Sequence, residues 1–397
     1  MVHSQLALYC LGGIILCIPE TDISIIKSHQ LEDYDMPYSF DSKELEVIGR
    51  YNEKYPHAPQ LTKYNTPITP RENYLRMFRG EKPLWMPAHT DNMYFGPNCL
   101  PDVIARGPSG SFNADPVDLD HVGGPDMFGV EWVYVPAVNG SMPKPGFRLV
   151  PDIEHWEDYV TFPDVSSWDW AGDAERNREF INQGLATSFT IHNGLFERLI
   201  SFTDMQDALM ALIDEDQQPA VHRLFNRLCD LYEEIICNAK KWFDIDFIWF
   251  HDDWGSQRSA LFSLDTCREM IMPYLKRVAD CAHRNGLYLE LHSCGKNEEL
   301  VPAMIEAGVD AWRGQALNNK QKLFKEYGNK IVLGIEPTEL PANTEDFEQL
   351  ERDCLEFVKQ YAASGRVYSS MFKIPPKARD YIYTFSRELL ANAQAEE

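Results

Sequence analysis

Residues 287–295 read Leu-Tyr-Leu-Glu-Leu-His-Ser-Cys-Gly, a stretch that predicts a β-strand ending in a turn. Because side chains alternate between the two faces of a strand, Glu290, His292 and Cys294 share one face. A carboxylate, an imidazole and a thiol are all zinc-ligand types, and Gly295 suits a sharp turn out of the strand. A buried cysteine beside a hydrogen-bonded histidine is the plainer alternative, and spacing alone leaves both open.

Around this stretch, apolar segments alternate with helical segments along most of the chain. Such alternation predicts a parallel sheet covered by helices. Eight strands would close a barrel, an open doubly wound sheet is the alternative, and no G-x-G-x-x-G motif supports a dinucleotide-binding fold. We therefore predict an α/β (β/α)₈ TIM barrel. Its strands are expected at 84–88, 188–192, 246–251, within 287–295, at 309–312, 331–335 and 366–369, with one more somewhere in 84–150.

Two segments do not fit the alternation and predict additions to the barrel. Residues 1–65 form an N-terminal extension, with a helix expected around 42–54, and residues 66–397 form the barrel domain. The apolar run at 6–19 is too short to span a membrane and lacks the basic start of a secretory signal. We interpret this run as a packed strand or as residues from a start codon placed upstream. Residues 97–170 predict a long irregular insertion after the first strand, either a lid or a plain hairpin insertion.

The amino-acid composition restricts the classes of partner and the cellular location that we expect. The formal net charge is −24, which argues against nucleic acid and against an anionic membrane surface as the main partner. Nine scattered cysteines without a C-x-x-C motif predict a reducing, cytoplasmic location rather than a disulfide framework. Monomer and homodimer both stay open.

Polar and titratable residues gather just after the expected strands, where barrels place their chemistry. Each has a plainer alternative: a helix cap or an arginine partner for the aspartates, a core or helix-capping role for the histidines, and a turn role for Glu336. The candidates are His89, His192, Asp252, Asp253 and Gln257 for catalysis and Tyr94, Trp132, Trp254 and Gln315 for the substrate.

The pairing of His292 with Cys294 at a strand end favours a metal site. A bound zinc ion lowers the pKa of a coordinated thiol or acts as a Lewis acid. A catalytic zinc site needs a third protein ligand. Glu290 on the same strand and Glu336 two strands on are the candidates.

Five motifs carry a family resemblance over residues 66–390. They are T-P-R-E-N-Y-L-R-M-F-R-G-E-K-P at 69–83, D-M-F-G-V-E-W at 126–132, H-D-D-W-G-S-Q at 251–257, H-S-C-G at 292–295 and G-V-D-A-W at 308–312. With these motifs the chain resembles the uroporphyrinogen decarboxylase-like superfamily, which includes corrinoid (cobalamin)-dependent methyltransferases. The resemblance implies a (β/α)₈ barrel.

Two departures decide which branch the chain is closer to. The stretch at 86–94 has no arginine, whereas true uroporphyrinogen decarboxylases grip carboxylates there with arginines. In the methyltransferases, H-x-C and a later cysteine bind zinc; His292 and Cys294 match the first two, but 369–375 has no cysteine. The resemblance therefore implies a branch that demethylates a small O- or N-methylated substrate.

The resemblance leads us to expect a zinc-assisted methyltransferase that passes the methyl group to a corrinoid carried by a partner protein. Asp252, Asp253 and Gln257 would orient the substrate, His89 or His192 would protonate the leaving group, and Tyr94, Trp132 and Trp254 would line an aromatic pocket. Two alternatives remain: a metal-free decarboxylase, for which only Arg258 and Arg313 lie near strand ends, and a non-catalytic barrel that binds a corrinoid partner.

Overall fold

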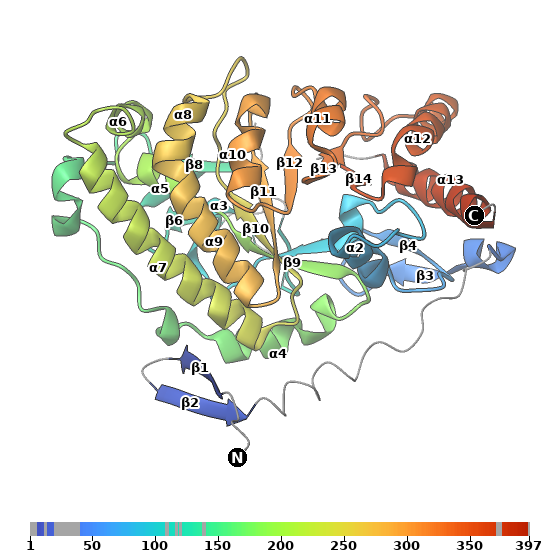
Figure 1. Cartoon of the computed structure of the whole chain (residues 1–397), viewed down its shortest axis with the longest axis horizontal. Coiled ribbons are helices and arrows are strands. Elements are labelled where there is room, and N and C mark those ends of the chain that lie inside the picture. Colours follow the sequence, from blue (N-terminus) through green and yellow to red (C-terminus); the bar gives the residue numbers. More distant parts are fainter. Residues whose placement is uncertain are drawn as a thin grey trace.

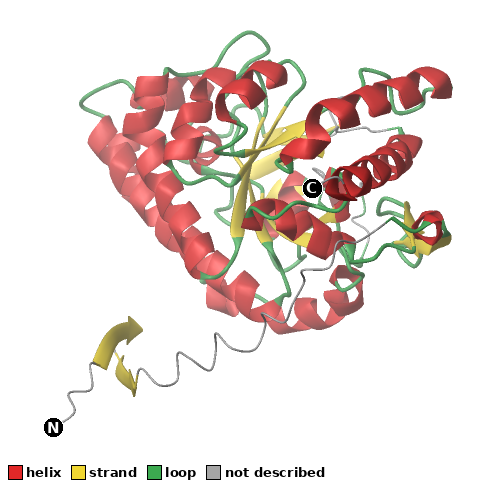
Figure 2. Ribbon diagram, turned by 45° about the vertical axis from the view of Figure 1, so that its right-hand side comes forward, coloured by secondary structure: helices red, strands yellow, loops and turns green. Residues whose placement is uncertain are grey.

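The computed structural model describes residues 6–11, 14–19, 40–107, 111–115, 118, 121–136, 140–370 and 375–395. A seven-stranded parallel sheet lies at its centre, with helices around it (Figures 1 and 2). The strand order is β14-β13-β12-β11-β10-β9-β5. These strands are β5 (Asn92–Phe95), β9 (Ala186–Ile191), β10 (Phe247–His251), β11 (Tyr288–Ser293), β12 (Ala311–Gly314), β13 (Val332–Ile335) and β14 (Val367–Ser369).

The two edges of this sheet meet, so it curls into a barrel. Ala88, just before β5, forms a parallel bridge with Ser369 at the end of β14. The amide of Ser369 donates to the carbonyl of Pro87 at 3.0 Å. The predicted α/β TIM-barrel fold is therefore confirmed, with seven strands in the sheet of the described residues.

The expected strand at 84–88 is where the structure differs most from the predicted sheet. The amide of Leu84 and the carbonyl of Trp85 bond to the side chain of Asn73, and the amide of Met86 donates to the hydroxyl of Ser386. Side chains thus take the backbone groups that a ladder would have used. Only the end of this stretch, at Pro87 and Ala88, reaches the sheet, and β5 supplies the strand.

Helices follow most strands and cover the outside of the barrel. In the helices α7 (Gln218–Trp242) and α9 (Met272–Arg284) the buried residues recur at helical spacing, as expected for an amphipathic face on a sheet. A π-helical turn at Cys267–Ile271 interrupts the expected helix at 265–285. The helices are α2 (Pro70–Arg79), α4 (Trp170–Ile181), α5 (Leu195–Phe202), α6 (Met205–Ala211), α7 (Gln218–Trp242), α8 (Leu264–Thr266), α9 (Met272–Arg284), α10 (Val301–Glu306), α11 (Lys320–Tyr327), α12 (Phe347–Tyr361) and α13 (Pro376–Ala395).

The insertion after β5 contains α3 (Pro101–Arg106) and a separate antiparallel sheet. That sheet consists of β6 (Gly123–Pro125), β7 (Glu131–Val135) and β8 (Gly140–Pro143). The side chain of Arg198 on α5 ties the insertion to the barrel, because it pairs with Asp102 of α3 and with Asp126 before β7. All three side chains are buried.

Part of the N-terminal extension packs on the last helix (Figure 1). The helix expected around 42–54 is wrong: a 3₁₀ turn at Ser42–Leu45 is followed by an antiparallel hairpin of β3 (Val47–Tyr51) and β4 (Leu61–Tyr64). Tyr64 stacks on Tyr383 of α13, and Glu44 pairs with the buried Arg387. Within the apolar run, β1 (Leu6–Leu11) and β2 (Ile14–Pro19) pair antiparallel. Among the residues described, no helix is both long and apolar enough to cross a membrane.

Candidate metal centre

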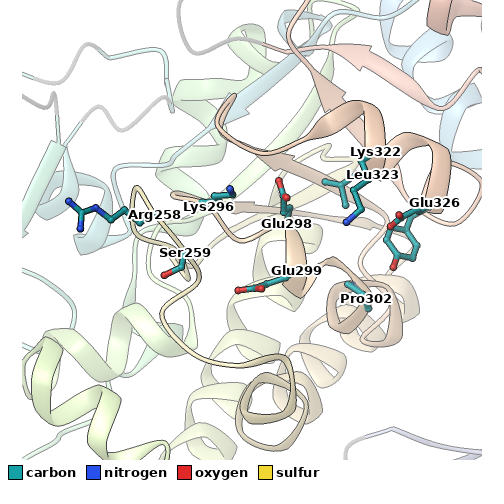
Figure 3. A pocket seen from close by; sticks show the side chains of 10 residues that line it. Arg258, Ser259, Lys296, Glu298, Glu299, Pro302, Lys322, Leu323 and Glu326 are labelled. Atoms are coloured by element: carbon teal, nitrogen blue, oxygen red, sulfur yellow. The ribbon is translucent and has the colours of Figure 1, made fainter.

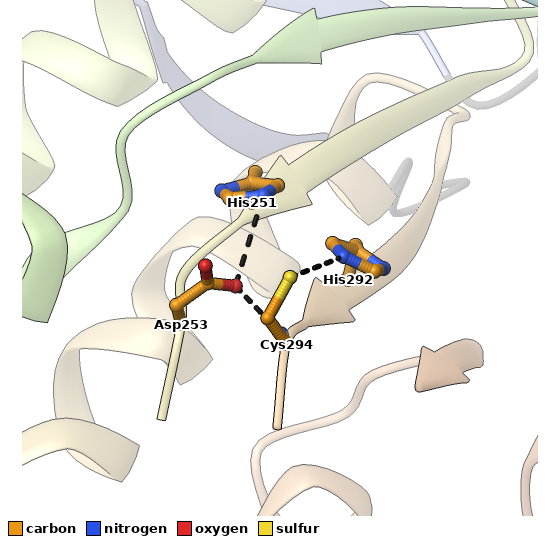
Figure 4. Close-up of side chains that lie close together, drawn as sticks. All are labelled: His251, Asp253, His292 and Cys294. Atoms are coloured by element: carbon orange, nitrogen blue, oxygen red, sulfur yellow. Dashed lines mark hydrogen bonds and ion pairs between the residues drawn. The ribbon is translucent and has the colours of Figure 1, made fainter. Parts of the chain in front are cut away.

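Four side chains with metal-binding atoms meet where β10 and β11 end (Figure 4). One ligand atom from each of His251, Asp253, His292 and Cys294 lies within 4.8 Å of the others. His251 and His292 are register partners in the parallel pair. Because residues two apart share a strand face, Asp253 and Cys294 extend over the same side as the two histidines.

A hydrogen bond at Nδ1 of His292 turns its Nε2 toward the other three side chains. Its Nδ1 lies 2.6 Å from the carbonyl oxygen of Arg313, an acceptor that requires Nδ1 to carry the proton. Its Nε2, which lies 3.4 Å from the Cys294 sulfur, then presents a lone pair. Burial, the charged His251 ring and Arg313 lower the pKa of His292 well below its usual value, so the ring is neutral.

His251 is held in the same manner, with a carboxylate as the partner. Its Nδ1 lies 2.6 Å from Oε2 of Glu197, and its Nε2 lies 3.7 Å from Oδ1 of Asp253. Burial opposes the charged ring, but Glu197 and Asp253 together raise the pKa of His251 well above its usual value. A metal ion binding at Nε2 would displace that proton.

Asp253 and Cys294 would supply the anionic ligands to a bound metal ion, and both side chains are partly exposed to solvent. The amide of Cys294 donates to Oδ1 of Asp253 at 2.6 Å, and the Asp253 side chain is 31% exposed. Burial works against ionisation, yet the rings of His251 and His292 lower the pKa of Asp253. Burial raises the pKa of the Cys294 thiol, whereas a bound metal ion would deprotonate it.

This donor set fits zinc. Two imidazole nitrogens, one thiolate and one carboxylate are ligands that Zn²⁺ takes, and tetrahedral coordination requires ligand atoms roughly 3.3–3.8 Å apart. Two separations, 3.4 Å for His292–Cys294 and 3.7 Å for His251–Asp253, fall in that range, and all four ligand atoms lie within 4.8 Å of one another.

Two glycines bring the loops after β10 and β11 into backbone contact. A Cβ on Gly295 would lie 2.1 Å from the carbonyl carbon of Gly255, and the φ of Gly295 is +83°. The amide of Lys296 donates to the carbonyl of Ser256 at 2.7 Å across the same contact. This close approach holds Asp253 and Cys294 beside each other.

Glu290 and Glu336, predicted as third ligands, are engaged elsewhere. Glu290 is fully buried inside the barrel, where it accepts from the hydroxyl of Tyr94 at 2.8 Å and lies 3.6 Å from Nε of Arg313. Glu336 lies 3.6 Å from Nζ of Lys320. Neither joins a metal-binding group among the described residues, so His251 and Asp253 replace them as the predicted companions of His292 and Cys294.

The carboxylate of Asp252 lies outside the metal-binding group found among the described residues. The buried carboxylate of Asp252 accepts from the amides of Phe196 and Glu197 at the start of α5 and from the indole of Trp254. This is the helix-capping alternative. Gln257 is exposed in the loop after β10.

His89 lies in the 3₁₀ turn before β5, and His192 directly follows β9. Neither joins the metal-binding group found among the described residues. Nε2 of the buried His192 lies 3.1 Å from the hydroxyl of Ser111, and burial followed by the charge of Arg106 lowers the pKa of His192 to about 3. Burial and then Arg313 lower the pKa of the partly buried His89. As neutral rings, both can donate a hydrogen bond but are poor acids at neutral pH.

The four residues predicted to contact substrate have internal partners. Tyr94 packs under Arg313, whose guanidinium carbon lies 4.3 Å from the ring centroid. The indole of Trp132 donates to Asp126, and that of Trp254 to Asp252. The Gln315 side chain accepts from the amide of Gly295 at 2.9 Å and so supports the loop that carries Cys294.

A pocket of about 360 Å³ lies outside the loops after β10 and β11 (Figure 3). Its lining mixes three basic side chains with three acidic ones, and none of the four candidate ligands takes part. The charged residues are Arg258, Lys296, Lys322, Glu298, Glu299 and Glu326.

His251 and Glu197 are the functional candidates to which sequence reasoning assigned no role. His251 carried a detectable signal: H-x-D at 251–253 and H-x-C at 292–294 each place two ligand types two residues apart at a strand end. Glu197 had none, because its contact with His251 links two different elements, α5 and β10.

No protein-family model matches the sequence, and no curated protein matches it either. Among solved structures, the chain is similar to a methyltransferase from Methanosarcina mazei, with a TM-score of 0.53 and 14% identity over 83% of this chain and 100% of the other. A xylanase from Gloeophyllum trabeum aligns with a TM-score of 0.35 and 12% identity, over 56% of this chain and 82% of the xylanase. A xylose isomerase-like TIM barrel protein from Mycobacterium smegmatis aligns with a TM-score of 0.32 and 11% identity, over 62% of this chain and 85% of the other. At these identities the similarity shows the fold alone: the chain has the α/β barrel of the methyltransferase.

Proposed function

We propose that this protein is a zinc-dependent methyltransferase that moves a methyl group from a small O- or N-methylated substrate to a corrinoid carried by a partner protein. The observation that carries the proposal is the group formed by His251, Asp253, His292 and Cys294, with ligand atoms within 4.8 Å of one another at two strand ends. The fold shared with a methyltransferase over that protein's whole length supports the choice of reaction.

When bound, Zn²⁺ would supply Lewis acidity toward the heteroatom of the methyl donor. His251 and His292 would hold the metal through Nε2, because their Nδ1 atoms are bonded to Glu197 and to the Arg313 carbonyl. In the proposed transfer the methyl carbon would leave the heteroatom of the donor for the corrinoid of the partner protein, whose reduced Co(I) form would supply the bonding electron pair, and the heteroatom would take up a proton from solvent. Neutral His192 can assist only as a hydrogen-bond donor.

Of the described residues, the two arginines that the sequence offers to the decarboxylase alternative are engaged elsewhere. Arg313 lies 3.6 Å from the carboxylate of Glu290 and covers Tyr94, and Arg258 lines the separate outer pocket. Neither is placed to grip several substrate carboxylates beside the strand ends.

A direct test combines metal analysis with transfer to free cob(I)alamin. The purified protein is assayed on methoxyaromatics and methylamines while its zinc content is measured. We expect about one zinc per chain, loss of activity with a chelator, and loss of both zinc and activity in His292→Ala and Cys294→Ala. Cys237→Ser, which changes an exposed thiol on α7, is the matched control.

Two results would refute parts of the proposal. Activity that ignores chelators in a zinc-free protein removes the metal from the reaction. A protein that binds zinc but transfers no methyl group from any donor would refute the methyltransferase and keep the metal site. Release of carbon dioxide from a polycarboxylate by the metal-free protein would favour the decarboxylase.

A further inference from the structure

The ring of His251 is held by a chain of buried charges that reaches into the insertion. Oε2 of Glu197 lies 2.6 Å from Nδ1 of His251, and Oε1 of the same carboxylate accepts from Arg106 at 3.2 Å. The side chains of Arg106 and Glu197 are only 10% and 11% exposed. The guanidinium carbon of Arg106 lies 4.7 Å from the ring centroid of Trp132. Three elements, α3, α5 and β10, therefore meet in one line of contacts.

The geometry points to Glu197 and Arg106 as positioning residues of the metal centre, in which Glu197 orients the His251 ring for the metal and Arg106 orients Glu197. This inference rests on the metal site of the proposed function. A ligating histidine commonly donates its second N–H to a carboxylate, which selects the tautomer and the ring orientation and makes the ligand more basic. Here Glu197 accepts at Nδ1, so Nε2 is the nitrogen left to face Asp253 and Cys294.

The position of Glu197 is set independently of its side chain. Its amide donates to Asp252 at 2.8 Å, so the first turn of α5 is clamped to the loop after β10. The carboxylate is thereby presented to His251 by a fixed backbone. Arg106 neutralises the charge of the Glu197 carboxylate. The anionic ligands of the metal would then be Asp253 and Cys294 alone. Zn²⁺ bound by a carboxylate, a thiolate and two neutral imidazoles would form an electrically neutral centre.

The insertion thus acquires a role beyond that of a lid or a hairpin. Arg106 lies on α3 and packs on Trp132 of β7, both within the irregular segment. Any change that displaces α3 would loosen Glu197 and, through it, one metal ligand.

The test measures metal affinity rather than activity. Wild-type apoprotein, Glu197→Ala, Glu197→Gln and Arg106→Gln are titrated with Zn²⁺ against a chromophoric chelator. Removing such an outer carboxylate typically weakens metal binding roughly 10- to 100-fold. We expect the upper end of that range for Glu197→Ala and a smaller loss for Glu197→Gln, whose amide oxygen still accepts the Nδ1 proton. Arg106→Gln should fall between wild type and Glu197→Ala.

Asp310→Asn is the matched control, because Asp310 also pairs with a histidine, Nε2 of His283 at 2.8 Å, but precedes β12 at the other end of the barrel. It should bind zinc as wild type does. Substitution with Co²⁺ adds a readout that a purely structural role would not move: the thiolate-to-cobalt band should persist in Glu197→Ala, while the ligand-field bands change.

Thermal unfolding of each apoprotein checks the fold. Should Glu197→Ala fail to fold, the isosteric Glu197→Gln carries the test. Zinc affinities within twofold of wild type in both Glu197 variants would overturn the inference. A wild-type protein that binds no zinc would instead overturn the proposed function, so the two failures are distinguishable.

Discussion

At the scale of single residues, Asp252 and Asp253 are chain neighbours whose carboxylates serve different purposes. Both residues lie in the loop that directly follows β10, which ends at His251. Asp253 points into the metal group, whereas Asp252 points outward and accepts from two amides of α5 and one indole. Neighbouring acids in one motif therefore divide into one structural group and one candidate metal ligand.

We expect Asp252→Ala to lower the free energy of unfolding by about 2–3 kcal/mol, because it leaves the buried donors of Phe196, Glu197 and Trp254 without their acceptor. Asp253→Ala should do the reverse: little loss of stability and a clear loss of zinc affinity. Denaturant unfolding of both variants in the presence of a chelator measures the change in stability, and titration with Zn²⁺ measures the change in zinc affinity. Equal losses of stability in the two variants would contradict the assignment.

His192 gives the protein a predictable response to acid. Its folded-state pKa of about 3 lies below the usual 6.5, so the unfolded chain binds a proton that the folded chain refuses. The stability linked to His192 is complete above pH 6.5 and is lost as the pH falls toward 3; at pH 4.5 the loss is about 2–3 kcal/mol.

Replacing His192 by Asn removes this titration. The free energy of unfolding of His192→Asn should fall less than that of wild type between pH 8 and pH 4.5. Denaturant unfolding at the two pH values measures the difference. Parallel curves for the two proteins would show that His192 is protonated in the folded state.

At the scale of elements, the unit that builds the site is the β10–β11 pair with its two loops. Register places His251 beside His292, and the Gly255–Gly295 contact places the following residues side by side. Each strand offers two ligand types, and neither alone completes a zinc site.

Gly295→Ala should therefore abolish high-affinity zinc binding although every ligand remains. The added methyl group would meet the Gly255 backbone, and the φ of +83° is strained for alanine. Gly286→Ala is the control, since Gly286 has a φ of +68° but no atom within 4 Å of an added Cβ. It should lose only about 1 kcal/mol and keep its zinc affinity; equal zinc affinities in the two variants would contradict the role of the contact.

At the scale of the whole molecule, the insertion and the barrel are joined through the buried Arg198. Its guanidinium pairs with Asp102 and Asp126, and its carbon lies 4.9 Å from the ring centroid of Phe128. Burial, with Asp102 and Asp126 opposing it, leaves the pKa of Arg198 above its usual value. The positive charge of Arg198 therefore offsets the cost of burying the carboxylates of Asp102 and Asp126.

Arg198→Met should cost about 3–5 kcal/mol, because it leaves two buried carboxylates without their cation. The exposed Arg148, which pairs with Asp204 and Asp207, offers a matched control: Arg148→Met should cost less than about 1 kcal/mol. Thermal and denaturant unfolding measure both. A loss below 1 kcal/mol for Arg198→Met would show that the insertion is not held by this cluster.

The amino-acid sequence by itself determined the barrel and one half of the site. Strand–helix alternation predicts a parallel sheet because both periodicities are local, and two-residue spacing places His292 and Cys294 on one face for the same reason. Tertiary structure alone decided the other half. Which carboxylate meets the pair depends on the register between β10 and β11 and on a glycine contact between loops. Glu290, two residues before His292 on the same strand, instead pairs inside the barrel with Tyr94, which lies 196 residues earlier in the chain. Such contacts join residues far apart in sequence, and no local pattern encodes them.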